Sequence, residues 1–332
     1  MTRLIVSLCF VFSLFAHEEQ PIHSYLDSIE LGQAIAYKNL KIFPLVVKKM
    51  SSQSYTTLDQ AMKKGWLNIR EIGSGDVNSV EIKNTSAHMV FIMTGEIISG
   101  AKQDRMLSED LLLPPRSGWV RAPVYCVEHG RWTHVTPEFK SEELLVPNAL
   151  RKKAKITESQ SDVWDEIASC QDRLGIVSET RTVRANYADE RIQKRIDEYV
   201  QQFERIPVLS HNTVGVIVTT GDRIICCDIF ANNTLLAKLW KKLVRSYAMD
   251  ALDGDKATVT NDMVMAFLSS LENARYISTG TPGLGSLMKI ESNWGKGSAL
   301  VHTSVVHMDF FPLGGLHDDG GLRLDIRRDM RR

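Results

Sequence analysis

The chain has 332 residues and carries 40 basic and 40 acidic side chains, which give it a formal net charge of zero. Hydrophobic residues make up 43% and charged residues 24% of it, proportions that indicate a globular protein and exclude a disordered one. The balanced charge argues against a nucleic-acid partner, because a nucleic-acid binder usually carries an excess of lysine and arginine.

The N-terminus has the three parts of a secretory signal. Arg3 precedes an uncharged, mostly apolar stretch, residues 4–16, and a polar segment begins at His17. This stretch is shorter than the roughly 20 apolar residues of a membrane-spanning helix. We therefore expect residues 1–16 to be removed as a signal peptide. The mature chain would then be exported to the periplasm or the extracellular space, with no stable membrane span. The alternative is a buried N-terminal strand or helix.

Four cysteines remain in the mature chain, namely Cys126, Cys170, Cys226 and Cys227. They are too few for a disulfide scaffold, and without a C-x-x-C pair they indicate neither a zinc ribbon nor a thioredoxin-type site. Cys226 and Cys227 are adjacent in an apolar run, so in a strand they point to opposite faces. We predict buried thiols; a single disulfide between Cys126 and one of this pair is the alternative.

Residues 28–136 have the pattern of strands separated by turns. Residues 67–72 and 80–83 alternate between apolar and polar side chains, which is typical of half-buried antiparallel strands. The continuous apolar run at residues 89–93 indicates a central strand. One short helix is predicted at residues 58–64, between a capping threonine and a terminating glycine.

Residues 137–206 predict helices rather than strands. A highly charged helix is expected over residues 187–206, where the few apolar side chains are three or four residues apart and form one narrow stripe. Such a helix belongs on a surface. The basic run 151–155 is closely followed by acidic residues, and we interpret it as a solvated face. Residues 137–206 are therefore predicted to be a helical insertion.

The last third of the chain returns to strand patterns. Two apolar runs, residues 214–218 and 224–230, flank a Gly-Asp turn and predict a β-hairpin. Two helices are predicted after it, at residues 234–252 and 261–271. The first has a wide apolar stripe, which indicates a buried helix.

Strand-rich ends, a helical middle and no regular alternation of strands and helices indicate an α+β fold. We expect a mostly antiparallel, sandwich-like sheet core with the helical insertion and two further helices in the C-terminal half. Residues 28–312 would form a single α+β domain, and residues 313–332 a loose C-terminal tail.

The sequence lacks the familiar motifs of catalysis and cofactor binding. The glycine-rich segment 283–286 ends without the Lys-Ser/Thr of a phosphate loop, and neither Gly-x-Ser-x-Gly nor His-Glu-x-x-His occurs. His302 and His307 are five residues apart in a predicted strand, so their side chains point to opposite faces. We therefore expect no metal and no cofactor.

The densest group of polar residues lies at the ends of two apolar strands. Glu96 follows one of these strands and Glu128 follows the other. Carboxylates in such places are costly unless they are paired. Arg105 and Arg131 are natural partners, because a guanidinium can give a carboxylate two parallel hydrogen bonds. On the residues alone we favour this interpretation, in which two buried ion pairs and Trp132 hold adjoining strands together.

The functional interpretation makes the same residues a pocket for a small anionic or sugar-containing molecule, with tryptophan as a platform. The ligand-binding candidates are Gln103, Arg105, Glu128, Arg131 and Trp132. The preferred hypothesis is an exported binding or accessory domain. The alternative is a hydrolase in which Glu96 or Glu128 acts as the general acid or base, although the sequence suggests no nucleophile. The oligomeric state is left open.

A family resemblance rests on three strings of this group: Gly95-Glu96, Lys102-Gln103-Asp104-Arg105 and Cys126-Val127-Glu128-His129-Gly130-Arg131-Trp132. They resemble the ARG and Rhodanese-Phosphatase-superfamily-associated protein domain, a mostly bacterial domain of unknown function. The similarity extends over about residues 36–312. The family's association with ADP-ribosylglycohydrolases implies that an enzyme of this kind would hydrolyse a nucleotide-sugar or ADP-ribose-like substrate. The export signal and the long helical block depart from the family pattern.

Overall fold

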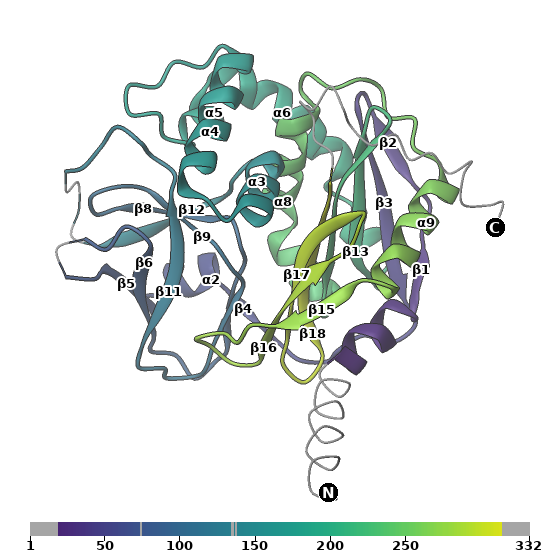
Figure 1. The fold of residues 1–332 in the computed structure, drawn as a ribbon, viewed down its shortest axis with the longest axis horizontal. Coiled ribbons are helices and arrows are strands. Elements are labelled where there is room, and N and C mark those ends of the chain that lie inside the picture. Colours follow the sequence, from purple (N-terminus) through teal and green to yellow (C-terminus); the bar gives the residue numbers. More distant parts are fainter. Residues whose placement is uncertain (1–18, 74, 134–135, 137, 314–332) are drawn as a thin grey trace, which may run out of the picture.

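The computed structural model describes residues 19–73, 75–133, 136 and 138–313. The predicted signal peptide and all but the first residue of the predicted tail lie outside the described residues. The described part is α+β with mostly antiparallel sheets, as predicted (Figure 1). None of its helices is long and apolar enough to span a membrane.

The larger lobe is built on a nine-stranded sheet with the order β1-β3-β13-β14-β18-β17-β16-β15, in which β2 also pairs with β3. The predicted hairpin is confirmed as β13 and β14. Segments that are far apart in the sequence lie side by side, since β3 pairs with β13 along its length (Figure 1). The strands are β1 (Ile29–Leu31), β2 (Ile35–Tyr37), β3 (Leu40–Val47), β13 (Thr213–Thr220), β14 (Arg223–Phe230), β15 (Arg275–Ser278), β16 (Ser286–Glu291), β17 (Gly295–Val301) and β18 (Val305–Pro312).

Helices cover both faces of this sheet. The buried helix α8 (Asn233–Ala251) packs on one face, and α9 (Asn261–Glu272) lies on the other. The two C-terminal helices are thus present, although α8 is capped by Asn232 and begins one residue earlier than predicted. Cys226 belongs to the hydrophobic cluster on the α8 side and Cys227 to the cluster on the α9 side, so the predicted alternation is confirmed. All four described cysteines are buried free thiols.

The smaller lobe pairs a six-stranded sheet, order β12-β8-β9-β11-β6-β5, with a three-stranded sheet, order β10-β7-β4. Their apolar side chains form one shared core. The helix α2 (Leu58–Lys63) begins at a capping box formed by Thr57 and Gln60. The strands are β4 (Thr56–Thr57), β5 (Leu67–Glu71), β6 (Ser79–Asn84), β7 (Val90–Ile92), β8 (Glu96–Gly100), β9 (Arg105–Leu107), β10 (Leu111–Leu113), β11 (Trp119–Cys126) and β12 (Phe139–Leu145).

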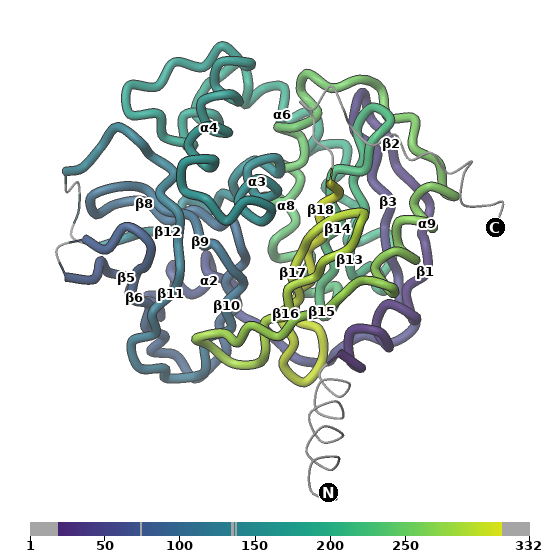
Figure 2. Tube along the Cα trace, in the orientation of Figure 1, coloured from purple at the N-terminus to yellow at the C-terminus, as the bar shows by residue number. Residues whose placement is uncertain are grey.

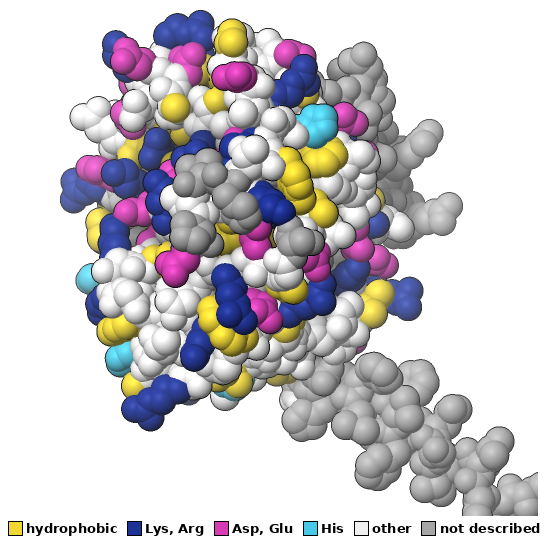
Figure 3. Space-filling view, turned by 90° about the vertical axis from the view of Figure 1, so that its left-hand side faces the viewer, with side chains coloured by type: hydrophobic (Ala, Val, Ile, Leu, Met, Phe, Trp, Pro, Cys, Tyr) yellow, Lys and Arg dark blue, Asp and Glu magenta, His cyan; other side chains and the backbone are white. Residues whose placement is uncertain are grey.

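The segment 137–206 begins with a strand, β12, and continues as helices that lead from the smaller lobe to the larger one (Figure 2). The charged helix α6 buries its narrow apolar stripe against α8 and leaves its other side to solvent. On the outer face of the smaller lobe, basic and acidic side chains are interspersed (Figure 3). The helices are α3 (Asn148–Thr157), α4 (Gln160–Leu174), α5 (Ala185–Ala188), α6 (Glu190–Phe203) and α7 (Ile206–Leu209).

Candidate functional site

Two of the predicted site residues, Glu128 and Arg131, form an ion pair just after β11. Arg131 Nη2 lies 2.6 Å from Glu128 Oε2, and Arg131 Nε donates to the same oxygen at 2.9 Å. The backbone N–H of Asp104 donates to it as well, at 3.1 Å. Burial alone raises the pKa of Glu128, but these hydrogen bonds outweigh it and leave the pKa below its usual range. A carboxylate held in its charged form is a poor general acid.

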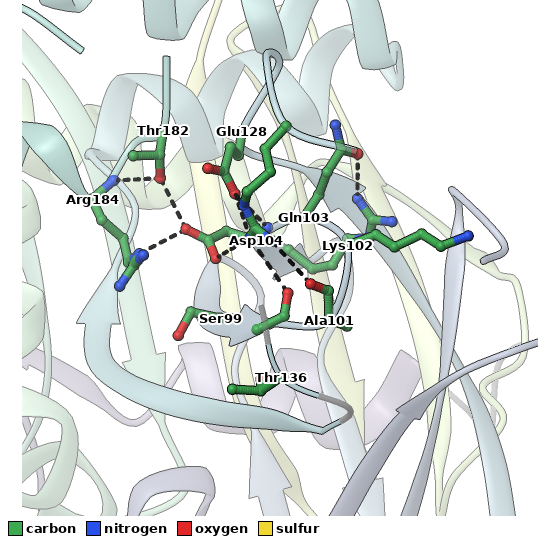
Figure 4. A network of polar contacts seen from close by, with 12 residues as sticks. Ser99, Ala101, Lys102, Gln103, Asp104, Glu128, Thr136, Thr182 and Arg184 are labelled. Carbon is green, nitrogen blue, oxygen red and sulfur yellow. Dashed lines mark hydrogen bonds and ion pairs between the residues drawn. The ribbon is translucent and has the colours of Figure 1, made fainter. Parts of the chain in front are cut away.

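Asp104 stands at the centre of this group (Figure 4). Its fully buried carboxylate accepts hydrogen bonds from Thr182 Oγ1 at 2.9 Å and from Arg184 Nε at 2.6 Å. Arg131 also contacts Asp104, at 3.3 Å, and donates to the carbonyl oxygen of Ala101 at 2.9 Å. With every nitrogen of Arg131 engaged by protein acceptors, the group works as a clamp between the helical segment and the smaller lobe.

Arg105 lies apart from this clamp. Residues 104 and 105 point to opposite faces of the chain, so Arg105 donates to Gln103 Oε1 at 2.9 Å and to Cys126 Sγ, while Asp104 meets Arg184. Gln103 correspondingly extends away from Arg184 (Figure 4). Arg105 is completely buried.

The expected pairing of Glu96 with an arginine is wrong. Glu96 instead pairs with Lys242 of α8, which also contacts Asp59 at 2.6 Å. Burial raises the pKa of Glu96 to about 7 against the lowering effect of Lys242. Because its side chain is 0% exposed, no substrate reaches it. Trp132, by contrast, is half exposed and has the ammonium of Lys102 5.1 Å from its ring centre. Of the five ligand-binding candidates, Glu128 and Arg131 form one ion pair and Gln103 and Arg105 one hydrogen bond, while Trp132 lies at the surface.

A second ionic centre, which the sequence analysis missed, lies where the two lobes meet. Arg151 of α3 gives Asp228 of β14 two parallel hydrogen bonds, at 2.9 and 2.6 Å. His307 of β18 is held at both ring nitrogens, by Asp110 Oδ2 at 2.6 Å and by Asp228 Oδ1 at 3.3 Å. The hydroxyl of Tyr247 donates to Asp228 at 2.5 Å. Asp110 comes from the smaller lobe, so this buried centre joins both lobes to α3.

The charges of this centre stabilise one another. Burial lowers the pKa of His307, but Asp110 and Asp228 outweigh it and raise the pKa to about 9. Burial raises the pKa of Asp228, but Arg151 and His307 outweigh it and hold the pKa far below its usual range. These groups are at most 3% exposed, so the centre is out of reach of a substrate. Among the described residues, no group of three or more His, Cys, Asp and Glu side chains is placed to hold a metal ion.

An open cleft lies beside this centre, between β11, the end of α3 and the hairpin of β16 and β17. The cavity measures about 90 Å³, and its wall includes Glu109 and Tyr125 from the smaller lobe. Lys155 enters it from α3, donates to Ser298 Oγ at 2.7 Å and lies 3.5 Å from Asp309 Oδ2. Burial raises the pKa of Glu109, although Lys155 and Lys289 lower it. In this cleft, unlike in the buried centre, charged side chains meet solvent.

The fold and this site define an α+β protein of two antiparallel lobes, with a buried ionic centre at their junction and a charged cleft beside it. The model of the ARG and Rhodanese-Phosphatase-superfamily-associated Protein domain matches residues 28–311, which is most of the chain. The chain therefore belongs to this family, as the resemblance implied. Comparisons with curated proteins and with solved structures gave no match.

Proposed function

We propose that the protein is a binding or accessory domain whose cleft holds a small anion, such as the phosphate group of a larger ligand. The observation that carries this proposal is Lys155. Its side chain is 12% exposed and is fixed by Ser298 and Asp309, so its ammonium group enters the cleft in a set position. An ammonium that is already ordered loses little entropy on binding an anion.

The size of the cleft supports a small group. A volume of about 90 Å³ holds the equivalent of about three water molecules, whereas sites for whole drug-sized ligands measure about 300–1,000 Å³. The cleft therefore suits the charged end of a ligand rather than an entire nucleotide-sugar.

Lysines and glutamates balance in the cleft. Lys289 is paired with Glu158 at 2.5 Å, while Lys155 and Lys296 face the cavity together with Glu109. A bound anion next to Glu109 favours the protonated form of that carboxyl, which burial already favours. Anion binding is therefore expected to take up a proton and to tighten as the pH falls.

The effect of burial on Glu109, which raises the pKa of that carboxyl, supports a second candidate function, a hydrolase with Glu109 as its general acid. A carboxyl whose pKa is raised by burial is suited to proton donation. Glu109 faces the cleft and so replaces Glu96 and Glu128 in this role. If the protein is a hydrolase, the wild-type chain is expected to hydrolyse p-nitrophenyl phosphate. Glu109→Gln should abolish this turnover and still bind inorganic phosphate. Without turnover in the wild-type chain, only the binding function stands.

The binding function is tested by calorimetric titration of the mature chain with inorganic phosphate. Lys155→Met is expected to weaken binding about tenfold or more, since a charged hydrogen bond contributes about 1.5–3 kcal/mol. Lys296→Met provides a second variant in case the first unfolds. The matched control is Lys140→Met, which changes a lysine that is 71% exposed on β12. This variant is expected to bind phosphate with the affinity of the wild-type chain. Equal affinities in all four proteins would contradict the proposal.

We also propose that the chain is exported. The supporting observation is the three-part pattern of residues 1–16, and the first described helical residues begin at position 19, so the expected cleavage removes none of the described fold. N-terminal sequencing of the protein recovered outside the cytoplasm is expected to begin at His17. A chain that lacks residues 2–16 should stay inside the cell; equal export of both chains would refute the proposal.

A further inference from the structure

A larger groove lies at the β15 edge of the nine-stranded sheet, between the end of α9 and the turn that joins β16 to β17. It measures about 500 Å³, within the range of about 300–1,000 Å³ typical of small-molecule sites. It shares Glu291 with the Lys155 cleft and is otherwise lined by different residues. The groove can therefore be tested separately from the cleft.

The lining of the groove fits neither an ion nor a lipid. Its two charged side chains, Arg275 and Glu291, have opposite signs, so the groove carries no net charge. Its apolar side chains are Trp294 and Ala266, too few to bind an acyl chain. The remaining lining residues are serines and asparagines, whose side chains both donate and accept hydrogen bonds.

Several of these polar groups have no protein partner. Arg275 and Glu291 lie directly opposite each other on β15 and β16. Throughout the part of the chain that the structure describes, no hydrogen bond or ion pair engages the side chains of Arg275, Glu291 or Asn293. Asn273 uses its amide nitrogen to donate to the carbonyl oxygen of Ser269 at 3.0 Å, which leaves its amide oxygen with no partner among the described residues. Donors and acceptors thus surround one half-buried indole ring, that of Trp294.

We propose that this groove binds a neutral carbohydrate. A pyranose ring has an apolar face of C–H groups, which stacks on the indole of Trp294, and a rim of hydroxyls that donate and accept at once. Asn273 and Asn293 offer amide groups to these hydroxyls, and Arg275 and Glu291, on neighbouring strands, offer a charged donor and a charged acceptor. The proposal rests on the groove alone and does not depend on anion binding at Lys155.

The test titrates the mature chain calorimetrically with glucose, galactose, mannose and N-acetylglucosamine, and with the β-1,4-linked dimers cellobiose, lactose and chitobiose. Saturable binding of at least one of these sugars is expected. Trp294→Ala should weaken it about tenfold, whereas Trp294→Phe, which keeps an aromatic face, should retain most of it. Asn293→Ala should weaken it as well.

Trp119→Ala is the matched control, because Trp119 is 39% exposed, is stacked against Arg70 and lies on β11 of the smaller lobe, which contributes no residue to the groove. This variant is expected to bind sugar normally. A cooperative urea unfolding transition of Trp294→Ala, like that of the wild-type chain, shows that the variant is folded. The proposal is overturned if no sugar of the panel binds saturably, or if Trp294→Ala binds as well as the wild-type chain.

Discussion

Replacement of Arg151 by methionine is expected to lower the free energy of unfolding by about 3–5 kcal/mol, because it takes from the buried Asp228 its bidentate ionic partner. Methionine keeps much of the volume of the side chain, so the loss reflects charge rather than packing. The remaining donors to Asp228 are Tyr247, His307 and, at 3.8 Å, the thiol of Cys226. Each makes one contact and cannot replace a bidentate guanidinium. Urea denaturation of both proteins at neutral pH measures the difference.

The matched control is Arg121→Met, which breaks an ion pair with Asp76 on the surface of the smaller lobe. Arg121 is 65% exposed, so this change is expected to cost at most about 1 kcal/mol. The double variant Arg151→Met/Asp228→Asn should be more stable than the sum of its two single losses predicts, since neither charge is then left alone. A loss in Arg151→Met no larger than that of the control would refute the importance of the buried centre.

Stability is also expected to fall as the pH rises from about 6.5 to about 9. The pKa of His307 is about 9 in the folded protein, against about 6.5 in an unfolded chain. The folded state therefore holds the proton of His307 more tightly than the unfolded state does. The resulting stabilisation is fully present below pH 6.5, the pKa in the unfolded chain, and is lost as the pH rises through about 9, the pKa in the folded protein. The full effect is on the order of 3 kcal/mol. Urea midpoints measured across this pH range give the slope.

His307→Gln is expected to be less stable than the wild-type chain at neutral pH and to show a flatter slope. The slopes must be compared between variants, because other groups also make stability fall as the pH rises. Burial raises the pKa of Cys226 and Cys227, so these thiols lower the stability near the upper end of the pH range. These thiols are present in both proteins and cancel. His302→Gln changes a half-buried histidine in the turn before β18 and should keep the wild-type slope. Equal slopes in all three proteins would contradict the assignment.

Local patterns were sufficient to predict the class of fold and several of its elements. The hairpin of β13 and β14 follows from two apolar runs around a tight turn, and α8 follows from a wide stripe of leucines. The opposite orientations of Cys226 and Cys227 follow from the period of a strand. Each of these signals is contained within about 20 residues, the span over which the period of an element can be read.

The site was harder to predict because its partners are remote in the sequence. Arg151 and Asp228 are 77 residues apart, and Asp110 and His307 are 197 residues apart. The predicted pairing of Glu96 failed for the same reason, since its partner lies on α8, 146 residues away. One signal was available: Asp228 and His307 stand within apolar strand runs, where an ionisable side chain requires a partner. That signal marks the residues but does not identify the partners.

The pairing of β3 with β13 has a consequence for the order of folding during synthesis. Leu40 is opposite Thr220, so the nine-stranded sheet cannot close until some 180 further residues have left the ribosome. The strands of the smaller lobe, residues 56–145, are contiguous in the chain and can assemble while translation continues. Strands β1 to β3 therefore stay unpaired with β13 while the smaller lobe is already folded. In chains stalled on the ribosome at increasing lengths, the smaller lobe is expected to become resistant to protease before the nine-stranded sheet does.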